Sequence, residues 1–459
     1  MRAAIMTFVL ACAALPAHAD PARDSDEFPH VSAYFDAQKR AFAAYEKRDA
    51  DAFLAGAKAM LVANPGHPPA RYALAAASAL AGDADTALRE LDALADLGLA
   101  QQPRREPAFA KMLDDPRFKA IELRFAENLK PRGTARVVLD ASGLPGDFIP
   151  EAFARDEAGK RTLFASVRQR RIAAVADDGS VSDFVPTARD GLMSALGIHV
   201  VGDEVLVASS GMAEMRPADT KLVGHAGVFA FARDGTLREK WLLPAPLPGR
   251  NQAIGDLLVL PGGRILATDS GGGAVYVLDR RVGHFFRLHG GLDLGAEADW
   301  FGSPQGMAAL DATRVAFADY TTGIWVLSDI KVDLHPKANG PAHSTRAGAS
   351  FMRLLADQPA ALYGIDGLYA YKGDLIATQN GTNPQRVLRL RLNAARDRIA
   401  SVEVLASGLS QWDEITLGEV VGDEFRFVAN SHWSKFDAKG DLPAASTLSS
   451  PAIMAVDLR

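Results

Sequence analysis

The sequence predicts an N-terminal α-helical domain followed by an all-β, six-bladed β-propeller. Residues 31–130 are rich in Ala, Leu, Arg and Glu and poor in β-branched residues, a composition typical of helices. Residues 134–459 instead alternate short apolar runs with Gly, Asp and Pro turns, which indicates sheet. A similar strand pattern recurs six times in this second region, and repeated sheet units of about 50 residues are typical of propeller blades.

Composition excludes several classes of protein. The chain has 459 residues, of which 48% are hydrophobic and 23% charged, ordinary values for a soluble globular protein. Its net charge of −6 excludes the basic surface of a nucleic-acid-binding protein. Cys12 is the single cysteine, so the chain has no internal disulfide and no cysteine-based zinc or iron–sulfur centre. After the first residues no apolar stretch is long enough to predict a membrane span.

The first residues have the pattern of an export signal. Arg2 precedes an apolar run over 3–15, and Ala-His-Ala at 17–19 supplies a cleavage pattern of small residues. We therefore predict a signal peptide over residues 1–19, cut before Asp20, and a periplasmic or secreted protein. A lipobox-like sequence at 9–12 leaves one alternative open, a lipoprotein anchored at Cys12.

The region 20–130 is expected to be a helical domain with an internal repeat. Asp-Ala-Asp at 49–51 recurs at 83–85, an offset of 34 residues, which is the period of tetratricopeptide units. Asp83 is expected to cap a helix over 84–96, and Pro116 suits the first turn of another helix. The domain is either a helical spacer or a groove for a protein partner. Two repeats favour the spacer, since about three are needed for a stable array.

Each predicted blade of the region 134–459 contains a tag, a short apolar strand that ends in a small residue and then a polar one. The six tags occupy residues 163–166, 206–209, 266–269, 317–319, 376–379 and 427–430. A second alternating strand follows each tag, and another precedes it. The strands at 136–139 and 452–456 are expected to close the ring.

Four oxygen-bearing side chains are expected at one end of the central channel, because the first strand of each blade lines it. They lie 13 to 15 residues before the ends of their tags, and they are Glu151, Asp256, Gln305 and Asp366. Clustered carboxylates repel one another unless a cation or protons offset their charge, and hard oxygen ligands suit Ca²⁺ or Mg²⁺. The alternative is that these residues cap turns at the starts of strands.

Three of these sites lie in motifs that resemble a known family. Gly-Ile-Asp-Gly-Leu-Tyr at 364–369, Pro-Glu at 150–151 and Ser-Pro-Gln-Gly at 303–306 are similar to the gluconolactonase-like family, which includes regucalcin and the luciferin-regenerating proteins. The resemblance covers about 135–459. It implies a six-bladed propeller whose channel holds a divalent metal, with Glu151 and Asp366 as ligands and Asp366 also as acid and base.

The resemblance has two departures. Gln305 stands where the family has Asn, and Gly255-Asp256 stands where it often has Asn-Asp, so that either Asp256 or Asn251 is expected to supply the remaining ligand. With Glu151, Asp256, Gln305 and Asp366 as the predicted ligands, the cofactor would be a divalent metal, most simply Ca²⁺.

The predicted chemistry is metal-assisted hydrolysis of a lactone or a related small ester. The cation would polarise the carbonyl, and Asp366 would accept a proton from the attacking water. Four side chains at the ends of tags are expected either to bind substrate hydroxyls or to cap strand ends: Asp269, Asp319, Asn380 and Asn430. Insertions at 210–227, 331–358 and 432–451 are expected to overhang the channel and set specificity.

A second class of function fits the same sequence. A non-catalytic propeller would bind a small molecule at the channel, and the helical domain would dock a protein partner. The scattered histidines 199, 225 and 432 and the tryptophans 300, 325, 412 and 433 are predicted to be structural. Metal content is the observation that separates the two classes.

Overall fold

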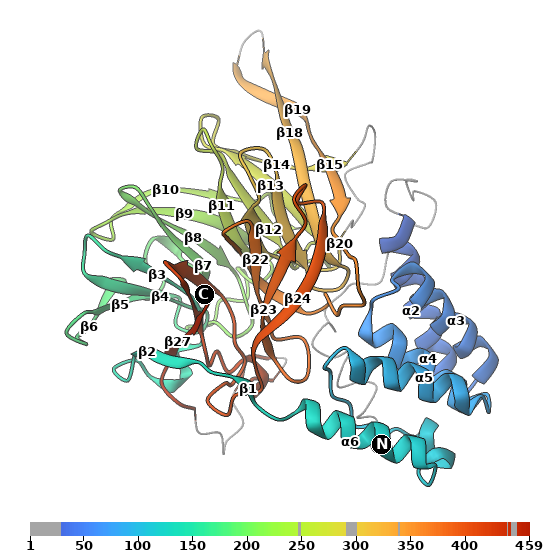
Figure 1. The fold of residues 1–459 in the computed structure, drawn as a ribbon. Coiled ribbons are helices and arrows are strands. Elements are labelled where there is room, and N and C mark those ends of the chain that lie inside the picture. Colours follow the sequence, from blue (N-terminus) through green and yellow to red (C-terminus); the bar gives the residue numbers. More distant parts are fainter. Residues whose placement is uncertain (1–28, 247–248, 291–300, 338–339, 438, 442–447) are drawn as a thin grey trace.

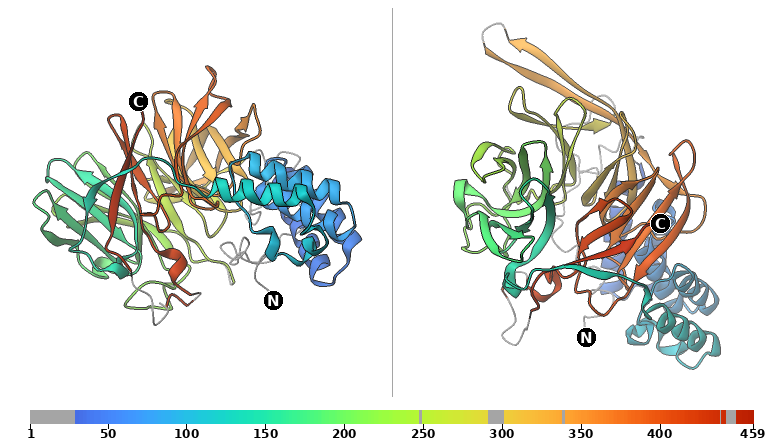
Figure 2. Two further views of the ribbon diagram at one scale, coloured as in Figure 1. Left: turned by 60° about the horizontal axis from the view of Figure 1, so that its bottom comes forward. Right: turned by 60° about the vertical axis from the view of Figure 1, so that its left-hand side comes forward.

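The computed structural model describes residues 29–246, 249–290, 301–337, 340–437, 439–441 and 448–459, so the predicted signal peptide lies outside the described residues. The chain begins with a helical domain and continues into a ring of six sheets (Figure 1). The helical domain lies to one side of the ring in Figure 1 and in the left view of Figure 2. None of the described helices is both long and apolar enough to cross a membrane.

The helical domain is built from two antiparallel helix pairs and a closing helix. Its helices are α2 (Pro29–Glu46), α3 (Ala50–Ala63), α4 (Pro68–Leu80), α5 (Ala84–Asp96) and α6 (Pro116–Asn128), with 3₁₀ turns η3 (Pro103–Arg105) and η4 (Pro107–Met112) before α6. Asp83 caps α5, as predicted, and Asp49 caps α3 in the same way, each accepting a backbone N–H at 3.0 Å. Pro116 begins α6, also as predicted. A protein partner for this domain stays a prediction.

The first three blades are four-stranded antiparallel sheets. Blade one contains β3 (Pro150–Asp156), β4 (Arg161–Ser166), β5 (Arg171–Ala176) and β6 (Val181–Val185). Blade two contains β7 (Ser194–Val201), β8 (Glu204–Ser210), β9 (Ala226–Ala232) and β10 (Leu237–Leu242). Blade three contains β11 (Ile254–Val259), β12 (Ile265–Asp269), β13 (Ala274–Asp279) and β14 (His284–Arg287).

The last three blades repeat the pattern with additions. Blade four contains β16 (Pro304–Ala309), β17 (Val315–Asp319), β18 (Gly323–Lys337) and β19 (Gly340–Arg353), joined by the short β15 (His289–Gly290). Blade five contains β21 (Ile365–Tyr371), β22 (Asp374–Gln379), β23 (Arg386–Leu392) and β24 (Arg398–Ser407), joined by β1 (Arg132–Gly133) and β20 (Leu355–Ala356). Blade six contains β25 (Gly418–Val421), β26 (Glu424–Val428), β27 (Ala452–Asp457) and β2 (Arg136–Asp140).

Blade six closes the ring with strands from both ends of the propeller region. Its three inner strands come from the C-terminal end, and β2, from the start of the region, pairs antiparallel with β27 as its outer strand. This pairing confirms the prediction for 136–139 and 452–456. Six clusters of buried apolar side chains lie between neighbouring blades, so each blade is stabilised by both neighbours.

The helical domain packs against blades four and five at the face where the inner strands begin, which we call the mouth. Ala361, before β21, belongs to the apolar core of the helices. The backbone N–H of Ala100 donates to Asn383 O at 2.7 Å, and Arg386 Nη1 donates to Leu97 O at 2.9 Å. Arg386 is buried at this contact, with 4% of the residue exposed, and this burial lowers its pKa to about 10.

One of the three predicted insertions points away from the mouth. Asp319 ends β17 at the mouth and pairs with Gly323, so β18 runs from the mouth toward the opposite face. The distal parts of the long strands β18 and β19 therefore project from that opposite face (Figure 1), and the prediction that 331–358 overhangs the mouth is wrong. The insertions predicted at 210–227 and 432–451 connect the second and third strands of their blades, which places their described residues at the mouth as predicted.

Candidate functional site

The inner strands of blades one, three, four and five carry a bulge directly after their first paired residue, and this bulge decides which side chains are equivalent. In blade one Pro150 pairs with Ser166 and Ala152 with Ala165, which leaves Glu151 as the extra residue. The register of blades four and five breaks at the same point, beside Gln305 and Asp366. In blade three the extra residue is Gly255, so Asp256 lies one residue further along its strand than the sequence spacing suggested.

Glu151 is held by a residue from the loop that follows β26. Its side chain is buried, and Oε2 accepts a hydrogen bond from Trp433 Nε1 at 2.6 Å. The prediction of a purely structural role for Trp433 did not include this contact. This hydrogen bond favours the ionised form of the carboxyl group, and Trp433 is thus a direct partner of a predicted metal ligand.

Asp366 is held by Asn380, one of the residues predicted at the ends of tags. Asn380 Nδ2 donates to Asp366 Oδ2 at 2.8 Å and to Ile415 O at 2.9 Å, while its Oδ1 accepts from the Tyr320 hydroxyl at 3.0 Å. Tyr320 in turn packs against Tyr363, whose ring contacts that of His67 in the helical domain. A continuous set of contacts therefore joins the helical domain to Asp366.

Asp256 bridges the inner strands of the two neighbouring blades. Oδ1 lies 2.9 Å from His199 Nε2 on β7, and Oδ2 accepts the backbone N–H of Met307 on β16 at 3.3 Å. A Cβ on Gly197 would lie 3.1 Å from Asp256 Oδ1, so the small residue leaves room for the carboxylate. Asp256 thus lies in the channel but is engaged by His199, which sequence analysis had assigned a structural role.

Burial and mutual repulsion raise the pKa values of the carboxyl groups at the mouth. Burial and the nearby charges of Asp366, Glu414 and Asp256 raise the pKa of Glu151 well above its ordinary value. Burial and the charges of Glu414 and Asp256 raise the pKa of Asp366 to about 7. The pKa of Tyr369 is raised by burial and by the same carboxylates. These groups are therefore close enough to influence one another across the channel.

The carboxylate and amide oxygens at the mouth are the kind of ligand that a hard divalent cation prefers. Within the described residues, Oε1 of Glu151, Oδ1 of Asp366 and Oε1 of Gln305 accept no hydrogen bond, while the other polar atom of each side chain is engaged. A Cβ on Gly255 would lie 3.4 Å from Gln305 Oε1, so the glycine gives this amide room. No group of three or more His, Cys, Asp or Glu among the described residues is arranged to hold a metal ion, so a cation here would need the amide and water as well as carboxylates.

Three of the four residues predicted to read substrate hydroxyls are engaged in turns. Asp319 is fully buried and accepts four hydrogen bonds, from the backbone of Ser303, Thr321 and Thr322 and from the Thr322 hydroxyl. Asp269 accepts the backbone N–H groups of Ala253 and Gly272. Asn430 bonds to Ser449, Ser450 and Ala452. These contacts are those of strand-end caps, whereas Asn380 contacts Asp366 directly.

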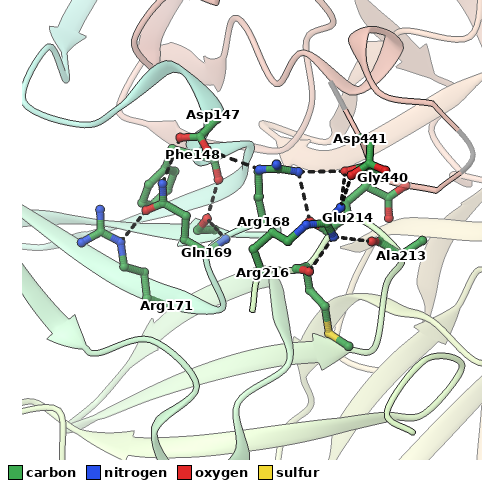
Figure 3. A network of polar contacts seen from close by, with 12 residues as sticks. Asp147, Phe148, Arg168, Gln169, Arg171, Ala213, Glu214, Arg216, Gly440 and Asp441 are labelled. Atoms are coloured by element: carbon green, nitrogen blue, oxygen red, sulfur yellow. Dashed lines mark hydrogen bonds and ion pairs between the residues drawn. The ribbon is translucent and has the colours of Figure 1, made fainter. Parts of the chain in front are cut away.

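A polar network ties together the loops around blade one at the mouth (Figure 3). Arg168, in the β4–β5 turn, donates to Gly440 O at 2.8 Å and to Asp147 at 3.3 Å. Arg216, in the β8–β9 loop, donates to Gly440 O at 2.9 Å and to Asp441 at 2.6 Å. The two arginines therefore fasten the loop that carries Trp433 to the loop of blade two.

Sequence reasoning missed Trp433, His199 and Glu414. Glu414 lies just before β25, its pKa is raised by burial, and it accepts the backbone N–H of Ser434 at 2.7 Å. Its position next to Asp413, in a loop with no repeat counterpart, left no sequence signal. A sequence signal did exist for Trp433, because this residue lies inside an insertion predicted to overhang the mouth.

No protein-family model and no curated protein matches this sequence. Solved structures do match. A gluconolactonase from Xanthomonas campestris, described as important in glucose secondary metabolic pathways, is 15% identical over 72% of this chain and 95% of its own, with a TM-score of 0.43. A luciferin-regenerating enzyme is 11% identical over 72% and 95%, with a TM-score of 0.43. Virginiamycin B lyase from Staphylococcus aureus is 12% identical over 72% and 100%, with a TM-score of 0.41. Gluconolactonase and luciferin-regenerating proteins are thus among the structures similar to this chain, but these similarities do not assign a reaction.

Proposed function

We propose that the channel mouth hydrolyses lactones or related small esters, with Asp366 as the acid and base. The observation that carries this proposal is the environment of Asp366, which is buried, bonded to Asn380 and has its pKa raised to about 7. A carboxyl group with a pKa near neutrality is well matched to accept a proton from water and return it to a leaving group.

Glu151, Gln305 and Asp366 would hold a divalent cation through their free oxygens, with Asp256 close by. Such an ion would polarise the ester carbonyl and offset the charge that develops on it. The buried, mutually repelling carboxylates support this assignment, because a cation relieves the repulsion that raises the pKa values of Glu151 and Asp366. Trp433 and Asn380 orient the two carboxylates.

Thermal unfolding with and without divalent cations tests the cation site. An ion that binds only the folded ring raises the melting temperature, so Ca²⁺, Mg²⁺ or Mn²⁺ should raise it for the wild type. Asp366→Ala should abolish that rise, while Asp178→Asn, at an exposed turn, should keep it. If none of the three ions moves the wild-type transition, the cation site is wrong.

A panel of lactones tests the reaction itself. The wild type should open at least one of them, and Asp366→Asn should lose this activity about 10²-fold or more while keeping some cation binding, because an amide offers an oxygen but is a poor base. A protein that binds lactones without opening them would contradict the hydrolase. It would favour the alternative function, a propeller that binds a ligand.

The proposal includes export, since the pattern of residues 1–19 is that of a signal peptide. The mature protein should begin at Asp20 in the periplasm or the medium. N-terminal sequencing of the protein from its native host checks this cleavage. A lipid-labelled form that Cys12→Ser abolishes would contradict it and favour the lipoprotein.

A further inference from the structure

Blade six carries a serine, a histidine and an aspartate in hydrogen-bonded order. His432 Nδ1 lies 3.0 Å from Asp413 Oδ2, and His432 Nε2 lies 3.3 Å from Ser449 Oγ. Asp413 comes from the loop before β25, while His432 and Ser449 come from the two ends of the loop between β26 and β27. No sequence motif marks this set, because the three residues meet only in the folded blade.

The three side chains have the exposure that a nucleophile and its base require. His432 is 3% exposed, Asp413 is partly buried and Ser449 is exposed. The imidazole is thus shielded, and Ser449 is exposed to solvent. Lys435 Nζ lies 3.5 Å from Asp413 Oδ2, so a cationic side chain lies beside this carboxylate.

Asn430 fixes the serine in place. Its Nδ2 donates to Ser449 Oγ at 2.7 Å and to Ser450 O at 2.8 Å, while its Oδ1 accepts the backbone N–H of Ala452 at 2.9 Å. With one N–H donated to Oγ, the hydroxyl proton of Ser449 is left for another acceptor. His432 Nε2 is the acceptor within reach.

The neighbours of His432 provide hydrogen-bond partners for both the neutral imidazole and the imidazolium. In the neutral form Nδ1–H donates to Asp413, and Nε2 accepts the proton of the Ser449 hydroxyl. Nε2 also lies 3.1 Å from Ser449 O, a contact that is favourable only when Nε2 carries a proton. The site therefore has a partner ready for the imidazolium that forms when His432 takes the serine proton.

This set borders the predicted active site without sharing its residues. Glu414, next to Asp413, raises the pKa of Asp366, and Trp433, next to His432, bonds to Glu151. An ester bound at the mouth would therefore lie near both sets.

We propose that Ser449, His432 and Asp413 form a second, cation-independent acyl-transfer site for small esters. Ser449 Oγ attacks the ester carbonyl while its proton passes to His432 Nε2, and a C–O bond forms. The C–O bond to the alcohol breaks, and the alcohol leaves with the proton from His432. Water then cleaves the acyl-serine by the same proton transfers, releasing the acid and restoring the hydroxyl.

Labelling with a fluorophosphonate probe in EDTA tests the site on the full-length protein. The probe phosphonylates an activated serine and releases fluoride, and digestion followed by mass spectrometry locates the modified residue. Wild type should be labelled at Ser449, and Ser449→Ala should not be labelled. Ser450→Ala, at the neighbouring serine, should be labelled like the wild type.

The base is tested separately. His432→Gln and Asp413→Asn should each slow labelling by about 10²-fold or more, provided that their melting temperatures show a folded ring. Asp366→Asn should leave labelling unchanged, so failure of the lactonase proposal and failure of this one are distinguishable. An unlabelled wild type, or undiminished labelling in folded His432→Gln, would overturn the proposal and leave the three residues as a clamp on the loop.

Discussion

Replacing Asp366 by Asn should stabilise the cation-free protein at neutral and alkaline pH. Asp366 is buried with other carboxylates, and its pKa is raised from the ordinary value of 3.8 to about 7. A folded-state pKa above the unfolded-state value means that the folded protein holds this proton more tightly. No stability is lost below about pH 4, and the loss grows as pH rises to about 7. Asp366→Asn has no ionisable group at this position, so its stability should not fall in this way as pH rises.

The size of the effect follows from the shift. About three pKa units correspond to roughly 4 kcal/mol of unfolding free energy, a full penalty above pH 7. The assay is thermal unfolding in EDTA at pH 4 and at pH 8 for wild type and Asp366→Asn. At each pH the assay gives the difference in unfolding free energy between Asp366→Asn and wild type. The change of this difference between pH 4 and pH 8 is the informative quantity, because effects of the amide that do not depend on pH cancel.

Asp178→Asn is the control for this experiment. The pKa of Asp178 is lowered by its hydrogen bonds to Ser180, so its replacement should give no gain at pH 8. The reasoning about buried repulsion would be refuted if the difference between Asp366→Asn and wild type were the same at pH 4 and pH 8.

Two further substitutions test the contacts at the mouth. Trp433→Phe removes the hydrogen-bond donor to Glu151 and should lower stability by about 1.5–3 kcal/mol at pH 8, measured by unfolding in EDTA. Trp412→Phe is the control, since Trp412 Nε1 has no hydrogen-bond partner among the described residues. Asp319→Ala leaves four buried donors without an acceptor and should cost on the order of 3–6 kcal/mol, whereas Asp269→Ala leaves two and should cost less. Equal losses of stability in the two tryptophan variants, or in the two aspartate variants, would contradict these assignments.

The sequence was sufficient for the architecture because the same physical pattern is repeated in every blade. Six apolar tags at similar spacing could be aligned with one another, and the strands at both ends of the region were free to complete the last sheet. The caps at Asp49 and Asp83 were predictable for the same reason, since they depend on neighbours only three residues away.

The site was less predictable because bulges and loop contacts decide it. Counting residues back from the tags placed Asp256 level with Asp366, but the bulge gives that position to Gly255. The bond between Trp433 and Glu151 joins residues 282 positions apart, and no local pattern fixes such a contact. The direction of the β18–β19 hairpin follows from strand alternation within the blade, because β17 ends at the mouth and β18 therefore runs away from it.

The rate of lactone hydrolysis as a function of pH tests the central claim most directly, that Asp366 is the acid and base of a channel-mouth hydrolase. With divalent cation present, the wild-type rate should rise with pH as the Asp366 carboxyl loses its proton, at a pH below the pKa of the cation-free protein because the cation favours the carboxylate. Asp366→Asn should lose the activity and this pH dependence together. A folded Asp366→Asn protein that hydrolyses the same lactone at the wild-type rate, with the same pH profile, would contradict the claim.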